Sequence, residues 1–426
     1  MKSLTPEEEK SQAYLDYPGK PKIFEPGKIT YHGEITFGRK NILLDLKSEE
    51  TGKKPKSVTI PPEKQYDLVG ATLLGLNDAL VRAEKGAALR DKLETVLEHY
   101  QPGDRKYGVY VYYPNSGDLV QYAPREWHRL ALVTSNSTLY LDPQRQLGWE
   151  EVRAKFDNLL IAVAGASVGS NVARAIAMDV RPEKLKIGDP NLFKVSNANR
   201  VWLSYEDIIV SNARAQELLY PLGLKNKAIG TAENIHKVDP FMDIYAYFEG
   251  VDSDNLASFV GGNRVEPAAD VIVEETDQPD AKMAIRLEAR KHGKRVLMVS
   301  DIGSWVQGDI RPFDLEPSTS LAYDISDDEL FERQKAVREK PSLETFLKFI
   351  EGWIGPEFLK SGEFGDLITG KLPKWTASMP QLGSTAGVAA GIVAEIVARS
   401  ALGYKFPERF IIDKRELKVQ SFGELI

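Results

Sequence analysis

A run of small residues follows an apolar segment in the middle of this 426-residue chain. Residues 159–163 include no polar side chain, and nothing larger than valine occurs between residues 164 and 170. This order is typical of a buried parallel strand that leads into a helix. Small residues such as Gly165, Ser167 and Gly169 let phosphate groups approach the backbone, and the first N–H groups and the dipole of a helix favour negative charge. The turn therefore predicts a nucleotide-binding site.

An aspartate stands at the end of the next predicted strand. Residues 184–188 lead into Asp189, about 24 residues after the turn begins, where a dinucleotide-binding unit places the carboxylate that binds ribose. The glycine pattern is incomplete, because Ala164 and Ala166 stand where glycines are usual. A plain strand-to-helix turn that binds nothing is the alternative interpretation of this unit.

The segment that begins at Asp189 carries a more specific motif. Residues 189–200 read DPNLFKVSNANR and resemble the D-x-D-x-V-x-x-S-N-L-N-R signature of the ThiF/MoeB/HesA family. This resemblance implies the adenylating fold of ubiquitin-activating enzymes, with ATP and Mg²⁺ as cofactors. It also implies that Asp189 holds the ribose hydroxyls and that Asn197 and Arg200 contact the phosphates.

Two more basic residues match the family's pattern in part. Arg145 and Gln146 match the last two residues of an S-R-Q motif, whose arginine reaches the nucleotide held by the other subunit of a dimer. Residues 223–228 resemble the family's G-x-x-K-A, which assigns the phosphate-contacting lysine to Lys227 and an insertion to residues 201–222. A solvated arginine and a surface lysine are the alternatives. The resemblance also implies a homodimer.

An acidic segment follows another predicted parallel strand. Residues 270–277 resemble the family's fourth strand, which ends near an aspartate that holds the magnesium nucleotide, and this implies a metal-binding role for Asp277. A carboxylate at the C-terminal edge of a parallel strand faces the crevice in which doubly wound folds bind ligands. An N-cap for the helix predicted over residues 280–292 is the alternative, and it is compatible with that role. Lys282 falls where relatives carry a basic residue near the phosphates.

The composition excludes several other classes of protein and of chemistry. With 62 acidic and 55 basic residues, the formal net charge of -7 gives no general attraction to nucleic acid or to an anionic membrane. The start is polar, and the apolar run at residues 386–398 is too short to span a bilayer, so we expect a cytoplasmic protein. There is no cysteine, and an enzyme-bound thioester is therefore excluded.

The length accommodates two domains, and we place their boundary near residue 140. Residues 1–140 are predicted to form an N-terminal α+β domain, and residues 141–426 a ThiF-like nucleotide-binding adenylation domain. The fold expected for the second domain is α/β, a Rossmann-like doubly wound and mostly parallel sheet. Its last long helix carries Gly383, Gly387 and Gly391 on one face, a spacing that allows close helix contact.

These residues together predict a ThiF-like adenylyltransferase. Arg200, Lys227 and Asp277 are the expected catalytic residues, and the carboxylate that ATP activates belongs to a peptide or small carrier protein, at its C-terminus or on a side chain. The acyl group then passes directly to an external amine, thiol or sulfur carrier, or the adenylate reacts within the substrate. One alternative is a nucleotide-binding partner subunit that has lost catalysis, and the altered glycine turn favours it. Another is an NAD-dependent oxidoreductase, which explains residues 164–189 but not Lys227 or Asp277.

Overall fold

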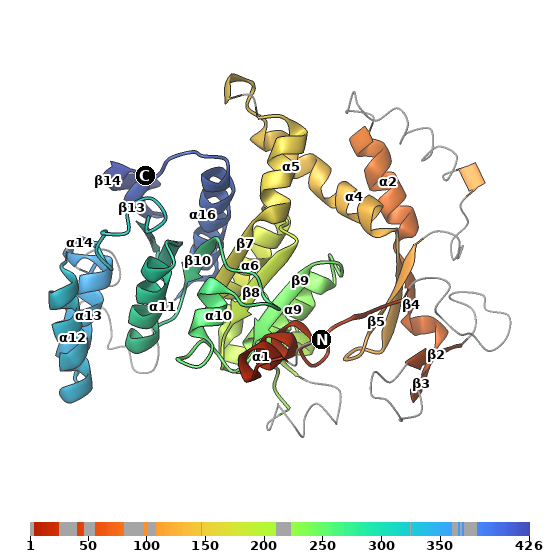
Figure 1. Cartoon of the computed structure of the whole chain (residues 1–426), viewed down its shortest axis with the longest axis horizontal. Helices are drawn as coiled ribbons and strands as arrows, with labels where there is room; N and C mark the ends of the chain where they lie inside the picture. The colour runs from red at the N-terminus through yellow and green to blue at the C-terminus, as the bar shows by residue number, and fades with distance from the viewer. Residues whose placement is uncertain are drawn as a thin grey trace.

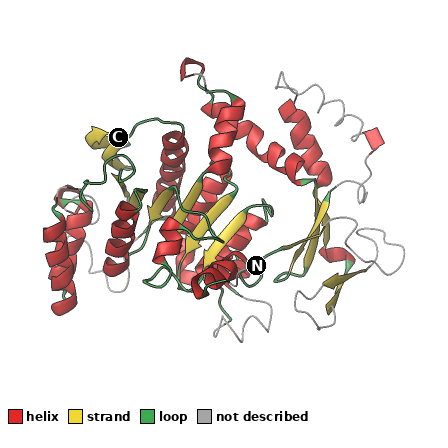
Figure 2. Ribbon diagram, viewed as in Figure 1, coloured by secondary structure: helices red, strands yellow, loops and turns green. Residues whose placement is uncertain are grey.

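The computed structural model describes residues 4–24, 41–46, 56–80, 98–99, 108–145, 147–209, 223–323, 325–359, 365–366, 369 and 381–426. Its largest feature is an eight-stranded sheet with the strand order β14-β13-β12-β11-β10-β7-β8-β9. Figure 2 shows the parallel strands β7, β8 and β9 in the middle of the molecule, with helices on either side, and the C-terminal strands toward the left. In chain order the strands are β7 (Leu160–Ala164), β8 (Lys184–Gly188), β9 (Asp243–Tyr247), β10 (Val271–Glu274), β11 (Arg295–Ile302), β12 (Trp305–Arg311), β13 (Pro407–Asp413) and β14 (Lys418–Leu425).

Five strands of this sheet, β9, β8, β7, β10 and β11, run parallel. Alternate residues of a strand point to opposite faces, and in β7 both faces are apolar and buried. Ile161 and Val163 belong to one core cluster, whereas Leu160, Ala162 and Ala164 belong to another. Both faces of β7 are covered by these clusters, which explains why every residue of the predicted strand is apolar. The predicted fold class, a Rossmann-like and mostly parallel sheet, is confirmed.

Different helices cover the two faces of the parallel strands. The helices over one face are α6 (Val168–Asp179), α9 (Lys227–His236) and α16 (Gly383–Ala401), and those over the other include α10 (Leu256–Gly261), α11 (Pro279–Lys291) and α13 (Leu343–Ile354). This part of the chain has four more helices. They are α5 (Trp149–Asn158), α7 (Tyr205–Ile208) and, next to α13 in the sequence, α12 (Asp327–Glu339) and α14 (Pro356–Leu359). Every described helix is too short or too polar to cross a lipid bilayer.

The N-terminal region forms a smaller sheet with the order β1-β5-β6-β4 and a separate hairpin. Its elements are α1 (Pro6–Leu15), β1 (Lys22–Phe24), β2 (Ile42–Leu46), β3 (Lys56–Ile60), β4 (Gln65–Asp67), α2 (Val69–Leu80), β5 (Val109–Tyr113), β6 (Asp118–Tyr122) and α4 (Arg125–Ser137). Helix α1, which the sequence did not predict, lies against β9 of the large sheet (Figure 1). Tyr14 stacks on Tyr247 with ring centroids 4.1 Å apart. Residues 1–140, predicted as a separate domain, therefore contribute α1 to the surface of the second one.

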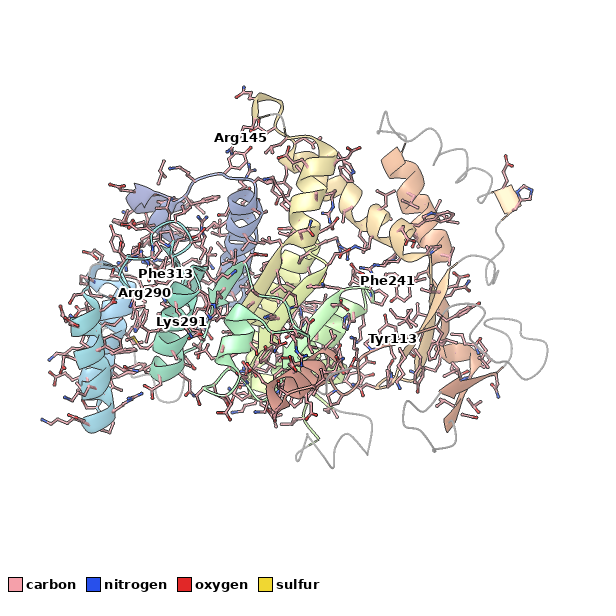
Figure 3. The ribbon with its side chains drawn as sticks, in the orientation of Figure 1. Tyr113, Arg145, Phe241, Arg290, Lys291 and Phe313 are labelled. Carbon is pink, nitrogen blue, oxygen red and sulfur yellow. The ribbon has the colours of Figure 1, made fainter. Side chains whose placement is uncertain are left out.

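Two further contacts join these parts of the chain. Tyr113 of β5 and Phe241, just before β9, belong to one buried cluster, and both are labelled in Figure 3. Arg129 of α4 donates hydrogen bonds to Asp239 at 3.1 Å and to Asp157 at 3.3 Å. The small sheet is thus tied to the same loops and helices that support β7 and β9.

The glycine spacing on α16 predicted close contact with another helix, but only one of the three glycines is closely packed. A Cβ atom at Gly383 would lie 2.9 Å from the carbonyl oxygen of Asn199, but one at Gly387 or Gly391 would meet no described atom within 4 Å. The helix packs through its other face instead, where Ala386, Ala389 and similar residues are buried. The small residues that matter for packing are the alanines.

Candidate functional site

A cavity of about 490 Å³ opens at the C-terminal ends of the parallel strands. Ala164, Gly188 and Glu274 end three strands in register, so the loops that follow them lie side by side. A cavity of this size is typical of small-molecule sites, and the crevice beyond the strand ends is where doubly wound folds bind ligands. The predicted site residues that line it are Gly165, Ser167, Asp189, Arg200, Lys227, Asp277 and Lys282.

The turn after β7 requires glycine at its first position. Gly165 has φ +96°, and a Cβ atom there would lie 2.7 Å from the carbonyl oxygen of Glu275. Its N–H donates to the carbonyl of Gly188 at 2.7 Å, which fixes the turn against β8. Helix α6 then begins at Val168, and no side chain caps its N-terminus. The free N–H groups of this N-terminus favour an anion beside the turn.

Asp189 is a buried carboxylate held by the backbone on both sides. Its Oδ2 accepts from the N–H of Ala166 at 2.7 Å, and its Oδ1 accepts from the N–H of Asn191 at 2.8 Å. Lys227 Nζ lies 3.6 Å from Oδ2. A carboxylate has about four lone-pair sites, so Asp189 can accept further hydrogen bonds from ligand hydroxyl groups in this position.

Lys227 owes its position to Asn226, which the sequence interpretation did not single out. Asn226 is the N-cap of α9, where its side chain accepts from the N–H of Ile229. Its amide also donates to the backbone oxygens of Asp189 at 2.9 Å and Phe248 at 3.0 Å. The start of α9 is therefore fastened to the loops after β8 and β9, and Lys227, the first residue of the helix, lies beside Asp189. Asparagine is a preferred N-cap residue, and Asn226 before Lys227 is the signal that could have indicated the start of a helix here.

Arg200 points back to the turn after β7. It follows the 3₁₀ helix η5 (Val195–Asn199), and its Nε donates to Ser167 Oγ at 2.9 Å. Burial lowers the pKa of its guanidinium, while Asp301 and Asp277 act in the opposite direction. The arginine thus brings a positive charge to the turn, between two acidic residues of the cavity.

Asp277 and Lys282 occupy different surroundings within the same cavity. Asp277 is exposed and is not the N-cap of α11, because that position belongs to Gln278. Lys282 is buried, and its Nζ lies 2.7 Å from both carboxylate oxygens of Glu274. The Lys282 ammonium group is therefore engaged in an ion pair with Glu274, whereas the Asp277 carboxylate is exposed to solvent.

Three of the predicted residues lie outside the cavity lining. Asn197 uses its side-chain oxygen to accept from the N–H of Lys194 at 2.8 Å. Gly169 lies in the first turn of α6, where a Cβ atom would come within 2.9 Å of Val163. Arg145 lies at the edge of the molecule (Figure 3), where it donates to the carbonyl of Gly403 at 2.8 Å. Of the insertion predicted over residues 201–222, residues 201–209 include the short helix α7, and residues 210–222 fall outside the described residues.

The cavity lining also includes five acidic residues that the sequence interpretation did not assign: Glu249, Asp252, Glu274, Glu275 and Asp301. Burial raises the pKa of Asp301 to about 6, although the Gln381 side chain and Arg200 act against this shift. Burial and the charges of Asp301 and Glu274 also raise the pKa of Glu275. The signal was available for Glu274 and Glu275, because both lie in the acidic segment 270–277 that predicted the end of a parallel strand.

Comparison with known proteins gives a family and distant structural relatives. A family model described as ThiF family matches residues 143–422. Uncharacterized protein MT1398 of Mycobacterium tuberculosis (strain CDC 1551 / Oshkosh) is 26% identical over 294 residues, which cover 67% of this chain and 37% of that protein. The chain thus spans little more than a third of this relative.

Solved structures of similar fold share little sequence with this chain. PaaA is 16% identical with a TM-score of 0.44, and the match covers 70% of this chain and 82% of PaaA. Escherichia coli MccB, solved with ATP, is 13% identical with a TM-score of 0.41, over 66% of this chain and 67% of MccB. E. coli tRNA N6-threonylcarbamoyladenosine dehydratase, solved with AMP, is 16% identical with a TM-score of 0.39, over 65% of this chain and 96% of that chain. The match of the family model over most of the chain is the stronger finding, and the chain belongs to the ThiF family.

Proposed function

We propose that this chain catalyses the ATP-dependent adenylation of a carboxylate carried by a peptide or a small carrier protein, at its C-terminus or on a side chain. The observation that carries the proposal is that Asp189, Arg200, Lys227 and Asp277 line one cavity, although about 90 positions of sequence separate the first from the last. Membership of the ThiF family supports the same activity.

The residues of the cavity suit a bound nucleotide. Asp189 would accept the ribose hydroxyl groups, and the turn at Gly165, without a Cβ atom, would admit phosphates to the N-terminus of α6. Arg200 and Lys227 would offset the negative charge that grows on the phosphates as pyrophosphate leaves. A peptide carboxylate oxygen would attack the α-phosphorus, forming an acyl-adenylate and releasing pyrophosphate.

The donor set also suits Mg²⁺ bound together with phosphates. Mg²⁺ keeps several waters and takes one or two protein carboxylates, and Asp277 offers one exposed carboxylate at the cavity. Within the described residues no group of three or more histidine, cysteine, aspartate or glutamate side chains forms a metal cage by itself. When bound, Mg²⁺ would neutralise charge on the phosphates.

The proposal includes a homodimer in the cytoplasm. Arg145 does not reach the cavity of its own chain, so its predicted contact with the nucleotide requires a second copy. Because the chain has no cysteine, the acyl group must leave the adenylate without a thioester on the enzyme.

The test is the exchange of labelled pyrophosphate into ATP in the presence of Mg²⁺ and a panel of peptide carboxylates. We expect carboxylate-dependent exchange in the natural sequence and a loss of about a hundredfold or more in Asp277→Ala. The control is Asp254→Ala, an exposed aspartate outside the cavity lining, which should exchange normally. No exchange with any carboxylate, or full exchange in Asp277→Ala, would contradict the proposal. Nucleotide binding without exchange would favour the partner-subunit alternative.

A further inference from the structure

The order of the parallel strands gives the cavity a direction. Asp189, proposed to bind the ribose, follows β8, and the turn at Gly165, proposed to bind phosphates, follows β7. On the other side of β7 the sheet continues with β10 and β11, whose C-terminal ends also line the cavity. Neighbouring strands lie about 5 Å apart, so the end of β11 lies about 10 Å beyond the phosphate turn. A substrate that reaches the α-phosphorus from the side away from the ribose therefore meets β11 and the helices that cover it.

An apolar wall lines this end of the cavity. It consists of Ile285 of α11, Met298 of β11 and, on α13, Phe346, Ile350, Trp353 and Ile354. All of these except Phe346 belong to one core cluster or pack against it, so they lie together on one face of the sheet. The alternation of β11 agrees, since Met298 belongs to this cluster and Val299 to the one on the opposite face.

Phe346 and Ile350 offer the accessible part of the apolar wall. They lie four residues apart on one face of α13, and both are half-buried, whereas Trp353 is 1% exposed. Two cations lie against the Trp353 ring: the guanidinium carbon of Arg286 at 4.5 Å and Lys282 Nζ at 5.5 Å from its centre. These contacts hold the indole in place, and the wall presents a firm aromatic and aliphatic surface to a ligand.

The two cations beside the apolar wall are already paired. Lys282 Nζ lies 2.7 Å from both oxygens of Glu274 and 3.3 Å from Met298 Sδ. Arg286 lies between two carboxylates, with its Nε 3.6 Å from Glu274 and its Nη1 3.4 Å from Asp309. A charged side chain that entered here would lose its hydration without gaining a free counter-charge, which costs free energy. An apolar side chain gains free energy when it leaves water for the same place.

We infer that the apolar wall is a specificity subsite for the acyl substrate, and that the substrate residue beside the activated carboxylate carries a large apolar side chain that packs on Phe346 and Ile350. This inference rests on the proposed function and names the class of substrate residue. The wall distinguishes phenylalanine or leucine from glycine, because the gain grows with the apolar area removed from water, and it distinguishes them from lysine or glutamate by the cost of desolvating a charge.

Binding of matched peptides tests the subsite without the reaction. Saturation-transfer NMR titrations on the full chain, without ATP, would compare N-acetyl-Ala-Ala-Ala-Phe with N-acetyl-Ala-Ala-Ala-Gly. We expect the peptide that ends in phenylalanine to bind about tenfold more tightly or better, and Phe346→Gln or Ile350→Gln to reduce this preference to about threefold or less. Phe346→Leu, which keeps an apolar side chain, should retain most of the preference. Leu343→Gln, at an exposed position of the same helix outside the cavity lining, should leave it unchanged.

The outcomes separate the subsite from the proposed function. Equal or undetectable binding of the two peptides, or an unchanged preference in a folded Phe346→Gln, checked by its urea unfolding, would overturn the inference. A second assay would compare pyrophosphate exchange with the two peptides at low concentration, where the ratio of rates reports kcat/KM. Equal rates would also overturn the inference, and the adenylation proposal would stand. A lack of exchange with any carboxylate, together with a binding preference that Phe346→Gln abolishes, would contradict adenylation and leave the subsite in place.

Discussion

Asp301→Asn is expected to stabilise the folded protein at neutral and alkaline pH. Burial raises the pKa of Asp301 from its ordinary value of 3.8 to about 6, so the folded state binds a proton there more tightly than the unfolded state does. The stability linked to this proton is complete below pH 3.8 and is lost as the pH rises through about 6. At about 1.4 kcal/mol for each pKa unit, the ionised carboxylate costs the folded state about 3 kcal/mol. Asparagine carries no charge and avoids this cost.

Urea unfolding at a series of pH values measures the effect. The free energy of unfolding of Asp301→Asn should exceed that of the natural sequence by up to about 3 kcal/mol near pH 8, and the gain should disappear below about pH 4. Gln381, Arg200 and Lys414 act on this carboxylate from neighbouring elements and lower its pKa, and Glu275 also interacts with it electrostatically. Asp254→Asn, which removes an exposed charge, should show no such dependence. A variant that is less stable near pH 8, or a gain that is equal at every pH, would refute the reasoning.

Three other substitutions test the site. Lys227→Ala should reduce pyrophosphate exchange by about a hundredfold, whereas Lys237→Ala, at an exposed position, should not; equal rates would remove Lys227 from the site. Gly165→Ala should lower the free energy of unfolding by about 1 to 3 kcal/mol, because φ is +96° and a Cβ atom would lie 2.7 Å from a backbone carbonyl oxygen. The same substitution should weaken ATP binding, measured by calorimetry. Unchanged ATP affinity would show that phosphates do not approach this turn. Lys282→Met should lower the free energy of unfolding in urea by about 3 to 5 kcal/mol, because it leaves Glu274 buried without its nearest partner. The double variant Lys282→Met, Glu274→Gln should recover part of this stability. A decrease below about 1 kcal/mol would contradict this view of the pair.

Much of the fold could be predicted from local patterns. The apolar run before Gly165 and the aspartate after the next strand indicated a doubly wound sheet, because burial on both faces requires apolar residues at every position of β7. Helix α1 was missed, because most of its residues are polar and it is held by contacts with residues more than 200 positions away, such as Tyr14 with Tyr247. Contacts of this kind leave no periodic signal in the sequence.

The candidate site was predictable in its charges but not in all of its contacts. Asp189 directly follows β8, and parallel strands bring such ends to one edge, whereas Arg200 and Lys227 come from the long segment between β8 and β9 and were assigned through the family's motifs. Asn197 belongs to the same motif, but the turn directs its oxygen to the N–H of Lys194. Lys282 was expected near phosphates, but it pairs with Glu274, since a buried carboxylate attracts the nearest flexible cation.

The sequence by itself determined the types of residue that the cavity can use, the absence of a thiol and the order of strands that places ligands at one edge of the sheet. Only the tertiary structure decided which of these side chains are paired within the protein and which remain available to a ligand. The physical reason is that burial and hydrogen bonding depend on neighbours from distant segments. Asp301 receives a donor from Gln381, 80 positions away, on one oxygen and none from the described chain on the other, and no local pattern contains that difference.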